Sequence, residues 1–265
     1  PAGSLKASLC HRGAQLLYEY SSARGIAHRR IGKLVVALRD EEIPRLVMMR
    51  ERLLSSGSEG CRLMDRAEAL ELEPELECAA ALWSPNTGIV DSHALIEALG
   101  GDADDAGAMR VLNTPVLGAT ACAEGWQVEL GGAEPTRICS RWLINAAGLG
   151  AQGLAARIEG FPPEAIPALH LAKGCYFSLS GASPFSHLIY PVPEPGGLGI
   201  HLSLDLAGQA RFGPDVEWVE AVDYEVPESR ASRFEAAVRK YWPTLKAGRL
   251  APAYAGIRPK LTGPG

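Results

Sequence analysis

The sequence lacks the features that most directly mark membrane, nucleic-acid and hydrolase functions. No apolar run approaches the ~20 residues needed to cross a bilayer, and no run of lysine and arginine marks a surface for nucleic acid. The formal net charge of −5 also argues against a nucleic-acid partner. Neither G-x-S-x-G nor H-E-x-x-H occurs, which excludes the nucleophile elbow of serine hydrolases and the helical zinc motif.

Cysteine is present but builds no recognisable framework. The six residues are scattered, with no C-x-x-C and no Cys/His pair at the spacing of metal ligands. We therefore expect no metal site, and reduced, buried thiols in a cytoplasmic protein.

The 265 residues, 47% of them hydrophobic, suffice for one large domain or two ordinary ones. With no initiator Met and with turn-forming residues at both ends, the sequence is typical of an internal segment of a longer chain.

Hydrophobic periodicity predicts a mixture of helices and strands. We expect helices over residues 4–20, 40–57, 64–72, 91–99 and 229–242. We expect strands over residues 33–38, 111–117, 126–130, 138–144, 170–179, 187–192 and 200–206, with a turn-rich link over 82–88. Asp40, Asp65 and either Asp91 or Ser92 are expected to cap three helices, and Ser232 with Glu235 the last. The mixture indicates an α/β (mixed α+β) fold with a nucleotide-binding part and a substrate-binding sheet.

The stretch 141–158, RWLINAAGLGAQGLAARI, stands out by its local pattern. The apolar run 142–144 is typical of a buried parallel strand, and a turn of very small residues follows it. A helical segment is expected over 154–158, which completes a geometry that brings a backbone close to a nucleotide. The glycines of 148–153 spell G-x-G-x-x-G, but no second strand ending in an acidic residue follows. Two interpretations of this glycine-rich turn are open. It contacts a nucleotide, or its glycines only allow close packing.

Polar side chains on one strand suggest a binding surface. His201, Ser203 and Asp205 alternate with apolar residues along the clearest strand pattern of the chain, so they share one face. If that face lines a cavity, the three side chains contact a polar substrate; a solvated sheet face is the alternative. His187 and Tyr190, in HLIYP, are expected to flank the same site, with a packed His and Tyr as the alternative.

Two cationic side chains are further candidates for substrate binding. Lys173, in AKGCYF, is suited to donate to an acid or a cofactor, although a lone lysine usually lies in solvent. Arg258, in AGIRPKL, follows small residues and precedes Pro259, which stiffens the backbone. A guanidinium fork held in this way suits bidentate capture of a carboxylate. A surface arginine in a turn is the alternative.

Five stretches together carry a resemblance to a known family. LINAAGLGAQGLA resembles the second nucleotide-contacting motif of the D-amino-acid-oxidase-like superfamily of flavoproteins. PAGSLKASL, TGIVDSHAL, LIYPVPEPGGLGIHLSLDLAGQARFGPDVEW and YAGIRPKLTGPG are similar to the L-2-hydroxyglutarate dehydrogenase/oxidase group of that superfamily. The similarity covers essentially the whole chain, and the stretch 188–218 is its most specific part.

The resemblance implies an FAD-dependent oxidoreductase with a Rossmann-like FAD-binding domain interleaved with a mixed or antiparallel substrate-binding sheet. The reaction it implies is oxidation of a small 2-hydroxy acid, such as L-2-hydroxyglutarate, to the 2-oxo acid by hydride transfer to the flavin. Oxygen or a quinone would then take the electrons. By domain, residues 1–30 and 86–158 would be FAD-binding, without the first dinucleotide fingerprint. Residues 31–85 and 159–253 would bind substrate, and 254–265 would return to the FAD-binding domain.

The resemblance also implies cofactor-binding positions. Asn145, Ala147 and Gly148 would lie near the FAD, and the backbone of Val116 would contact the adenine. These residues match the superfamily's second nucleotide-contacting motif and its meander.

The substrate positions follow in the same way. Arg258 matches the superfamily's arginine that pairs with the substrate carboxylate. His201 and Tyr190 would lie on the sheet over the flavin, where the imidazole could accept the hydroxyl proton. Lys173 and His187 are further candidates for substrate contact from their sequence context, and the resemblance does not assign them.

Two other functions are open at this stage. One is an amino-acid or amine oxidase of the same superfamily, oxidising glycine or sarcosine, and the other is a non-catalytic binding module with the same fold. The expected location is cytoplasmic, with a peripheral association with the inner membrane, through the electron acceptor, as the alternative.

Overall fold

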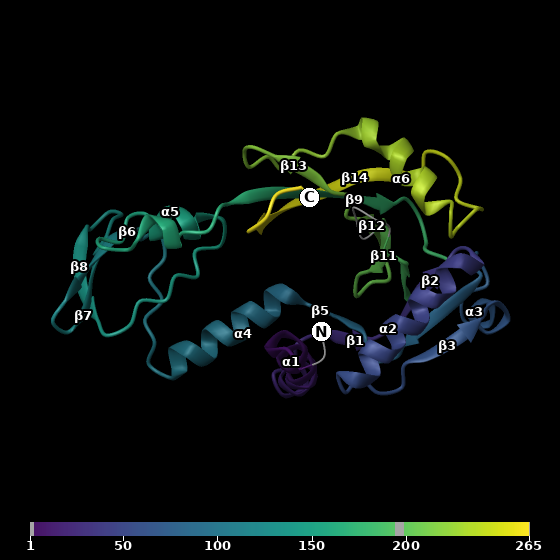
Figure 1. Ribbon diagram of the computed structural model, residues 1–265, viewed down its shortest axis with the longest axis horizontal. Coiled ribbons are helices and arrows are strands. Elements are labelled where there is room, and N and C mark those ends of the chain that lie inside the picture. Colours follow the sequence, from purple (N-terminus) through teal and green to yellow (C-terminus); the bar gives the residue numbers. More distant parts are fainter. Residues whose placement is uncertain (1–2, 194–198, 265) are drawn as a thin grey trace. The chain divides into compact units, whose positions relative to one another are not determined.

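The computed structural model describes residues 3–193 and 199–264 and shows a mixed α/β fold, which confirms the predicted class (Figure 1). The helices are α1 Leu5–Ala23, α2 Ile43–Ser55, α3 Arg66–Leu72, α4 Ser92–Asp105, α5 Ala151–Ala155 and α6 Ala231–Val238. The first strands are β1 His28–Arg30, β2 Lys33–Ala37, β3 Arg62–Asp65, β4 Ala80–Ser84, β5 Gly88–Val90, β6 Val116–Cys122, β7 Gly125–Leu130 and β8 Thr136–Ser140. The later ones are β9 His170–Leu179, β10 Leu188–Pro191, β11 His201–Leu204, β12 Ala210–Gly213, β13 Glu217–Val219 and β14 Leu250–Lys260.

The chain forms two compact units. Unit 1 comprises residues 1–102, 174–216 and 224–256, and unit 2 comprises 103–173, 217–223 and 257–265. Each unit is therefore assembled from segments that are distant in sequence. The assignment of domains to FAD and to substrate stays a prediction.

A twisted sheet forms the centre of unit 1. Its strands are ordered β9-β12-β11-β10-β2-β4-β3, and β14 also pairs with β9. The pairing is parallel only at β10·β2, where Leu188 is opposite Lys33, and antiparallel at the other junctions along this order. Strand β10 therefore joins segments from the two ends of the chain into one sheet.

One face of this sheet is the apolar core. Side chains at alternate positions of β2, β9, β10, β11 and β12 point to this face, and α6 covers it. Its fully buried members include Leu34, Ile189, Leu202, Phe212 and Phe177. The predicted stripe of α6 is confirmed, because its apolar residues pack into this cluster.

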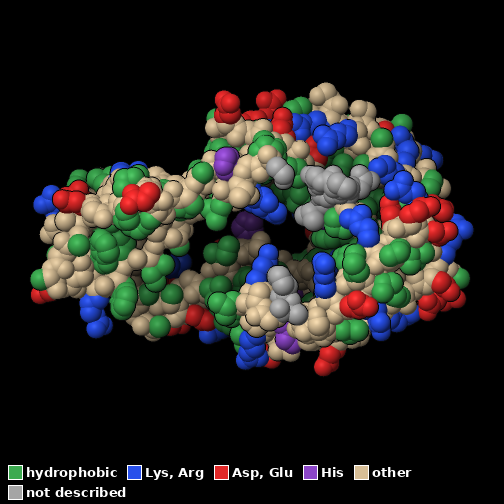
Figure 2. All heavy atoms as spheres, in the orientation of Figure 1, with side chains coloured by type: hydrophobic (Ala, Val, Ile, Leu, Met, Phe, Trp, Pro, Cys, Tyr) green, Lys and Arg blue, Asp and Glu red, His purple; other side chains and the backbone are tan. Residues whose placement is uncertain are grey.

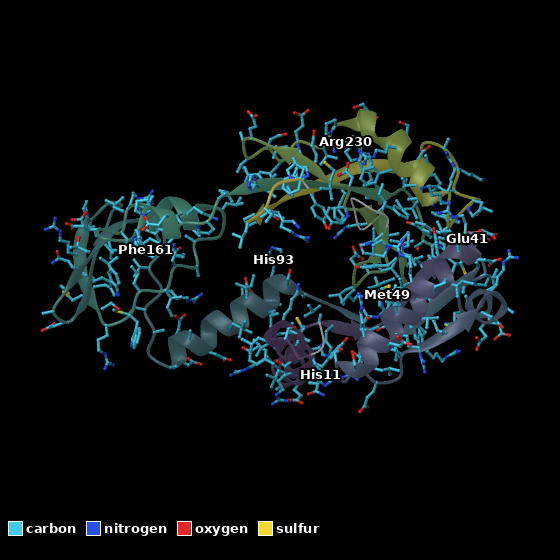
Figure 3. The ribbon with its side chains drawn as sticks, viewed as in Figure 1. His11, Glu41, Met49, His93, Phe161 and Arg230 are labelled. Carbon is cyan, nitrogen blue, oxygen red and sulfur yellow. The ribbon has the colours of Figure 1, made fainter. Side chains whose placement is uncertain are left out.

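Among the described residues, apolar side chains cover the opposite face at one end only. There α2 packs over β2 and β4, and a smaller cluster contains Val35, Leu46 and Leu82. Met49 of α2 packs against this cluster (Figure 3), as expected of core filler, whereas Met48 is 49% exposed. Beyond α2 the same face carries mostly polar and aromatic side chains.

The caps of the helices agree with the sequence in two cases. Asp65 caps α3 in a complete capping box with Glu68, and Asp91 accepts hydrogen bonds from the first turn of α4. The prediction that Asp40 caps the next helix is wrong. Asp40 lies in a 3₁₀ turn, Asp40–Glu42, and Glu42 instead accepts a hydrogen bond from the backbone of Leu38.

The last helix is shorter than predicted and is capped differently. A 3₁₀ turn, Glu228–Arg230, precedes α6, which ends at Val238. Ser232 therefore lies inside the helix, and no side-chain cap forms at its start. Glu235 instead accepts hydrogen bonds from Gly248 and Arg239, which tie the helix to the following loop.

Unit 2 contains the predicted three-stranded meander, β6-β7-β8. Two of its strands are displaced from prediction, because β6 runs over 116–122 rather than 111–117 and β8 ends at residue 140. Helix α5 spans 151–155 rather than 154–158. Gly118 allows the close approach of the segment after α5, since a Cβ there would lie 2.7 Å from the carbonyl oxygen of Arg157.

The predicted buried parallel strand over 142–144 is wrong for this structure. These residues form no strand, and Trp142 and Ile144 are 80% and 86% exposed. A parallel strand needs a neighbouring strand for its backbone groups, and none pairs with these residues within the described ranges. Figure 2 shows hydrophobic side chains on the surface of the meander part as well.

Three other strand predictions differ only in their limits. The link predicted over 82–88 is a turn only in part, because β4 extends to Ser84 and β5 begins at Gly88. Strand β11 ends at Leu204, before the turn that contains Asp205. The strand predicted over 187–192 is β10, Leu188–Pro191.

Buried thiols were expected, and half of the cysteines meet that expectation. Cys61, Cys78 and Cys175 are buried, and burial raises the pKa of Cys78 to about 11. The other three, Cys10, Cys122 and Cys139, are exposed, which corrects the prediction for them. Within the described residues, no helix is both long and apolar enough to span a bilayer.

Candidate functional site

The polar face of the unit 1 sheet is built around a stacked pair of rings. His201 of β11 is 7% exposed, and its imidazole stacks on the phenol ring of Tyr190 in β10. The ring centroids are 3.8 Å apart and the planes differ by 8°. Two adjacent strands therefore bring these predicted residues together. Burial raises the pKa of Tyr190, so its hydroxyl stays protonated over a wide pH range.

A second aromatic pair lies on the same face of the sheet. Tyr176 of β9 and Tyr254 of β14 stack with their centroids 4.6 Å apart. Gly213, opposite His201 in β12, leaves room for them: its φ is +139°, and an added Cβ would lie 2.9 Å from the ring of Tyr176. The polar face thus presents aromatic surfaces on both sides of a residue that has no side chain.

Charged groups border the aromatic pairs. The guanidinium of Arg211 in β12 lies 5.8 Å from the ring centroid of Tyr254 and 3.3 Å from the carboxylate of Asp205. Ser203 donates its hydroxyl to the carbonyl oxygen of Arg211 at 3.3 Å. The predicted polar positions 203 and 205 are therefore engaged with the neighbouring strand rather than only with solvent.

Lys33, at the start of β2, approaches the stacked pair from the other side. Its ammonium nitrogen lies 5.0 Å from the centroid of the Tyr190 ring. In the sheet order β2-β10-β11, the tyrosine stands between the lysine and His201. Burial lowers the pKa of Lys33 below its usual value. Sequence reasoning missed this residue, since the parallel pairing that brings it to Tyr190 has no local signal.

His187 does not lie with Tyr190 and His201, which corrects that prediction. It precedes β10 at an odd spacing from Tyr190, so the two side chains point to opposite faces. Its Nδ1 is 2.6 Å from Oε1 of Glu73, a side chain that is only 1% exposed. The ring also meets Trp83 edge to face with centroids 5.1 Å apart. These contacts are those of a packed histidine on the apolar side of the sheet.

Glu73 organises the segment that leads into β10. Its Oε1 accepts hydrogen bonds from the backbone of Ser186 at 2.9 Å and of His187 at 2.8 Å, and from the Ser186 hydroxyl at 3.0 Å. A buried carboxylate that is satisfied in this way fixes the position of its donors. Glu73 therefore fixes the backbone at the point where β10 begins, and in this way it helps to position Tyr190.

The remaining predicted substrate residues belong to unit 2. The ammonium of Lys173 forms an ion pair with Asp223, and the lysine side chain is 3% exposed, which rules out a solvated lysine. Arg258 lies in the part of β14 that belongs to unit 2, and it is exposed. Within unit 2, Lys173 already has a carboxylate partner, while Arg258 presents its guanidinium to the surface.

The loop 145–148 has the shape of a preformed turn. The Asn145 amide donates to the carbonyl oxygen of Ala151 at 2.7 Å and accepts from the backbone of Ala147 at 3.3 Å. Gly148 has a φ of +57°, and an added Cβ would meet no atom within 4 Å. The loop fits a nucleotide cofactor, because its small residues leave the backbone open while Asn145 holds the turn. Val116, predicted to contact adenine, is half-buried at the start of β6.

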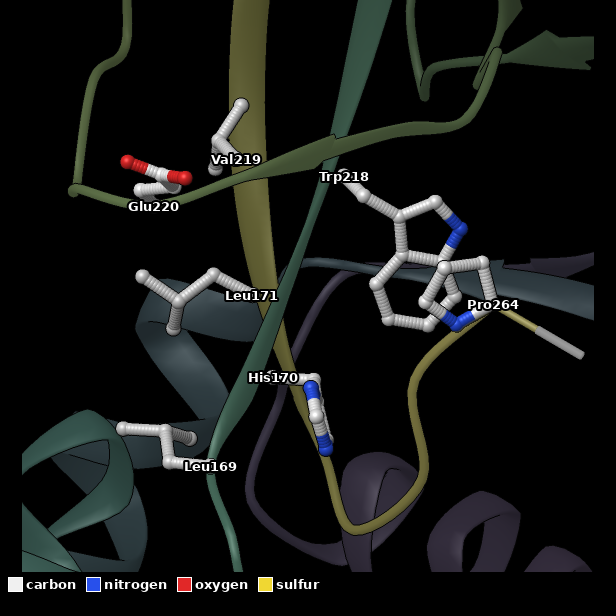
Figure 4. Close-up of a pocket in the computed structure, with 7 residues that line it drawn as sticks. All are labelled: Leu169, His170, Leu171, Trp218, Val219, Glu220 and Pro264. Atoms are coloured by element: carbon white, nitrogen blue, oxygen red, sulfur yellow. The ribbon is translucent and has the colours of Figure 1, made fainter.

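A separate cavity of about 520 Å³ lies within unit 2 (Figure 4). It is lined by Leu169, His170, Leu171, Trp218, Val219, Glu220 and Pro264. His170 and Trp218 meet edge to face with their centroids 6.4 Å apart. None of the residues predicted to be functional lines this cavity. Within the described residues, no cluster of His, Cys, Asp and Glu suited to a metal ion is found.

Curated proteins that are similar to this chain are named L-2-hydroxyglutarate dehydrogenase. The chain is 39% identical over 312 aligned residues to a mitochondrial L-2-hydroxyglutarate dehydrogenase of Arabidopsis thaliana, covering 100% of this chain and 63% of that protein. It is 31% identical over 225 residues to the protein of that name from Homo sapiens, covering 80% and 48%. The chain thus spans less than two thirds of the length of these curated relatives.

Solved structures show the same fold at low sequence identity. An FAD-bound L-alpha-glycerophosphate oxidase from Mycoplasma pneumoniae matches with a TM-score of 0.84 and 21% identity, over 97% of this chain and 69% of that one. A glycine oxidase from Geobacillus kaustophilus matches with a TM-score of 0.78 and 19% identity, over 98% and 69%. A family model described as FAD dependent oxidoreductase (DAO) matches residues 1–265, so the chain belongs to the DAO family of FAD-dependent oxidoreductases.

Proposed function

We propose that the protein oxidises a small L-2-hydroxy acid, of the L-2-hydroxyglutarate type, to the 2-oxo acid with FAD as cofactor. The observation that carries the proposal is the buried His201 stacked on Tyr190, on the polar face of a sheet in a DAO-family chain. The choice of substrate is supported by the relatives named L-2-hydroxyglutarate dehydrogenase.

His201 is the proposed general base. Oxidation of a secondary alcohol requires removal of the hydroxyl proton as the hydride leaves the same carbon, and a neutral imidazole can accept that proton. Stacking on Tyr190 fixes the plane of the imidazole ring before substrate arrives. The Tyr190 hydroxyl stays protonated, because burial raises its pKa, and can donate a hydrogen bond to the substrate.

Arg258 is the proposed partner of the carboxylate beside the reacting carbon. A guanidinium binds a carboxylate through two parallel hydrogen bonds, which orients the carbon as well as holding it. The position of Arg258 in the family motif, and the exposure of its side chain, support this role. Lys173 is paired with Asp223, so we assign it no direct contact with the substrate carboxylate.

The cofactor positions follow from the open turn. Asn145, Ala147 and Gly148 would hold FAD through the exposed backbone of their loop, and Val116 through its backbone in the meander. The chemistry that FAD supplies when bound is acceptance of a hydride from the carbon that bears the hydroxyl.

Oxygen or a quinone is the proposed final acceptor of the electrons. We retain a cytoplasmic location, or one peripheral to the inner membrane, as a proposal; the relatives are themselves named mitochondrial proteins.

The test is the visible spectrum of the protein, followed by addition of L-2-hydroxyglutarate without oxygen. Flavin absorption that bleaches on addition is the expected result and identifies both cofactor and substrate class. Bleaching by glycine or sarcosine instead would identify an amine oxidase and overturn the proposed substrate. A protein that shows no flavin absorption, even after addition of FAD, would be a binding module rather than an enzyme.

A further inference from the structure

Lys33 holds a positive charge at the edge of the polar face. Strand β2 places Lys33 and Val35 on the same side of the sheet as Tyr190, since Val35 is opposite Tyr190 in the parallel register. Val35 is covered by α2, whereas Lys33 lies two residues earlier along the strand and its ammonium lies over the tyrosine ring. Its ammonium is therefore directed to the stacked pair of Tyr190 and His201.

The charge of this lysine has no matching carboxylate among the described residues. Its ammonium lies 5.0 Å from the centroid of the Tyr190 ring, and the other titratable group that acts on it is the thiol of Cys61. The attraction between an ammonium and a ring face is weaker than the hydration or the ion pair that a charge in this half-buried position loses. Arg211, on the same face, differs because Asp205 is its partner at 3.3 Å. Lys33 is therefore suited to receive an anion from outside the protein.

We propose that Lys33 binds the second carboxylate of a dicarboxylic 2-hydroxy acid and so sets a preference for dicarboxylates over monocarboxylates. This inference rests on the proposed function, in which the carboxylate next to the reacting carbon is held elsewhere. Tyr190 lies between Lys33 and His201 in the sheet. A five-carbon diacid with its hydroxyl at His201 can pass along the ring and end at the ammonium. The aliphatic part of the substrate then passes beside the edge of the Tyr190 ring, since His201 stacks on the ring and the Lys33 ammonium lies over it.

The test compares two substrates in the FAD-loaded enzyme and in its Lys33→Met variant. L-2-hydroxyglutarate carries the second carboxylate, and L-2-hydroxypentanoate has the same chain length with a methyl group in its place. The variant is expected to lower kcat/KM for the diacid by about tenfold to a hundredfold, as expected for loss of a charge-assisted hydrogen bond. The value for the monoacid should fall much less, so the ratio of the two drops.

Lys246→Met is the matched control, because Lys246 is an exposed lysine of the same unit and its loss changes the net charge equally. The control should keep the wild-type ratio. An unchanged ratio in Lys33→Met, in an enzyme that oxidises L-2-hydroxyglutarate, would overturn the role of Lys33 and leave the proposed function standing. A wild-type enzyme that oxidises neither acid would overturn both. Thermal unfolding of each variant shows that the comparison is made on folded protein.

Discussion

The two faces of the unit 1 sheet use the same strands for different purposes. Leu202 and His201 are neighbours in β11, and both are nearly inaccessible to water. Leu202 points into the apolar core with Phe212, whereas His201 points to the polar face and stacks on Tyr190. The difference teaches that burial alone does not identify a core residue. What separates the two positions is what each side chain contacts.

The largest expected effect is a loss of stability from a substitution on the apolar face of the sheet. Leu202→Ala should lower the free energy of unfolding by about 2–5 kcal/mol, because it leaves a cavity in a fully buried cluster. Denaturant titration of the variant measures this loss. The rate of flavin reduction in the protein that remains folded should stay close to that of wild type. A stability loss below about 1 kcal/mol would mean that this face collapses to fill the space.

The next effect tests the polar face at the adjacent residue. His201→Gln keeps a polar side chain of similar length but removes the base, so the rate of flavin reduction by L-2-hydroxyglutarate should fall by about a hundredfold or more. Stopped-flow absorbance without oxygen measures this rate. The free energy of unfolding should change much less than in Leu202→Ala. A variant that reduces its flavin at the wild-type rate would remove His201 from the catalytic role.

The smallest effect concerns how Lys33 contributes to folding. Burial lowers its pKa below the ordinary value of 10.5, and Tyr190 and Cys61 are the titratable groups recorded beside it. Between the folded and unfolded pKa values the unfolded chain binds more protons, so the contribution of this group to stability rises with pH across that window. Below the window the charged lysine disfavours the folded state.

Lys33→Met should therefore be at least as stable as wild type near pH 7, and the difference should shrink as the pH approaches the pKa of a free lysine. Chemical denaturation near pH 7 and near the ordinary lysine pKa of 10.5 measures the free energy of unfolding of both proteins at each pH. A variant that is clearly less stable near pH 7 would show that the charge has a stabilising partner in the folded chain. The polar face would then resemble the core face in serving stability.

Much of the unit 1 fold was predictable from local pattern. The strand over 170–179, the cap at Asp65 and the buried stripe of α6 were all predicted and are confirmed. These features depend on alternation, on helical periodicity and on side chains that bond to their own backbone. Such signals are complete within a few residues, so a single sequence contains them.

The failures in unit 2 have a different cause. The run 142–144 has the composition of a buried strand, but it has no strand beside it and Trp142 and Ile144 remain exposed. The composition of a segment indicates whether its side chains are suited to burial. Whether they are buried depends on a neighbouring strand that pairs with the segment. In unit 1, the prediction at Asp40 failed because a 3₁₀ turn, Asp40–Glu42, precedes α2, so Asp40 does not stand at the start of that helix.

The candidate site was predictable in part. Alternation placed His201 on a polar face, and its contact with Tyr190 follows from two strands that are close in sequence. Lys33 could not be found in this way, since only the parallel pairing of β2 with β10 joins it to the site. The placement of His187 failed by one position in the strand, which is enough to reverse the face.

The parallel pairing of β2 with β10 also bears on how the chain folds. Strands β2, β4 and β3 are made early and can pair with one another, yet the other edge of β2 is filled only by β10, after the whole meander has been synthesised. Until then the unpaired edge and the apolar side of Leu34 and Val36 are accessible to other chains. Long-range pairing of this kind is slow to form. We therefore expect yields of folded protein to depend on growth temperature and on chaperone supply.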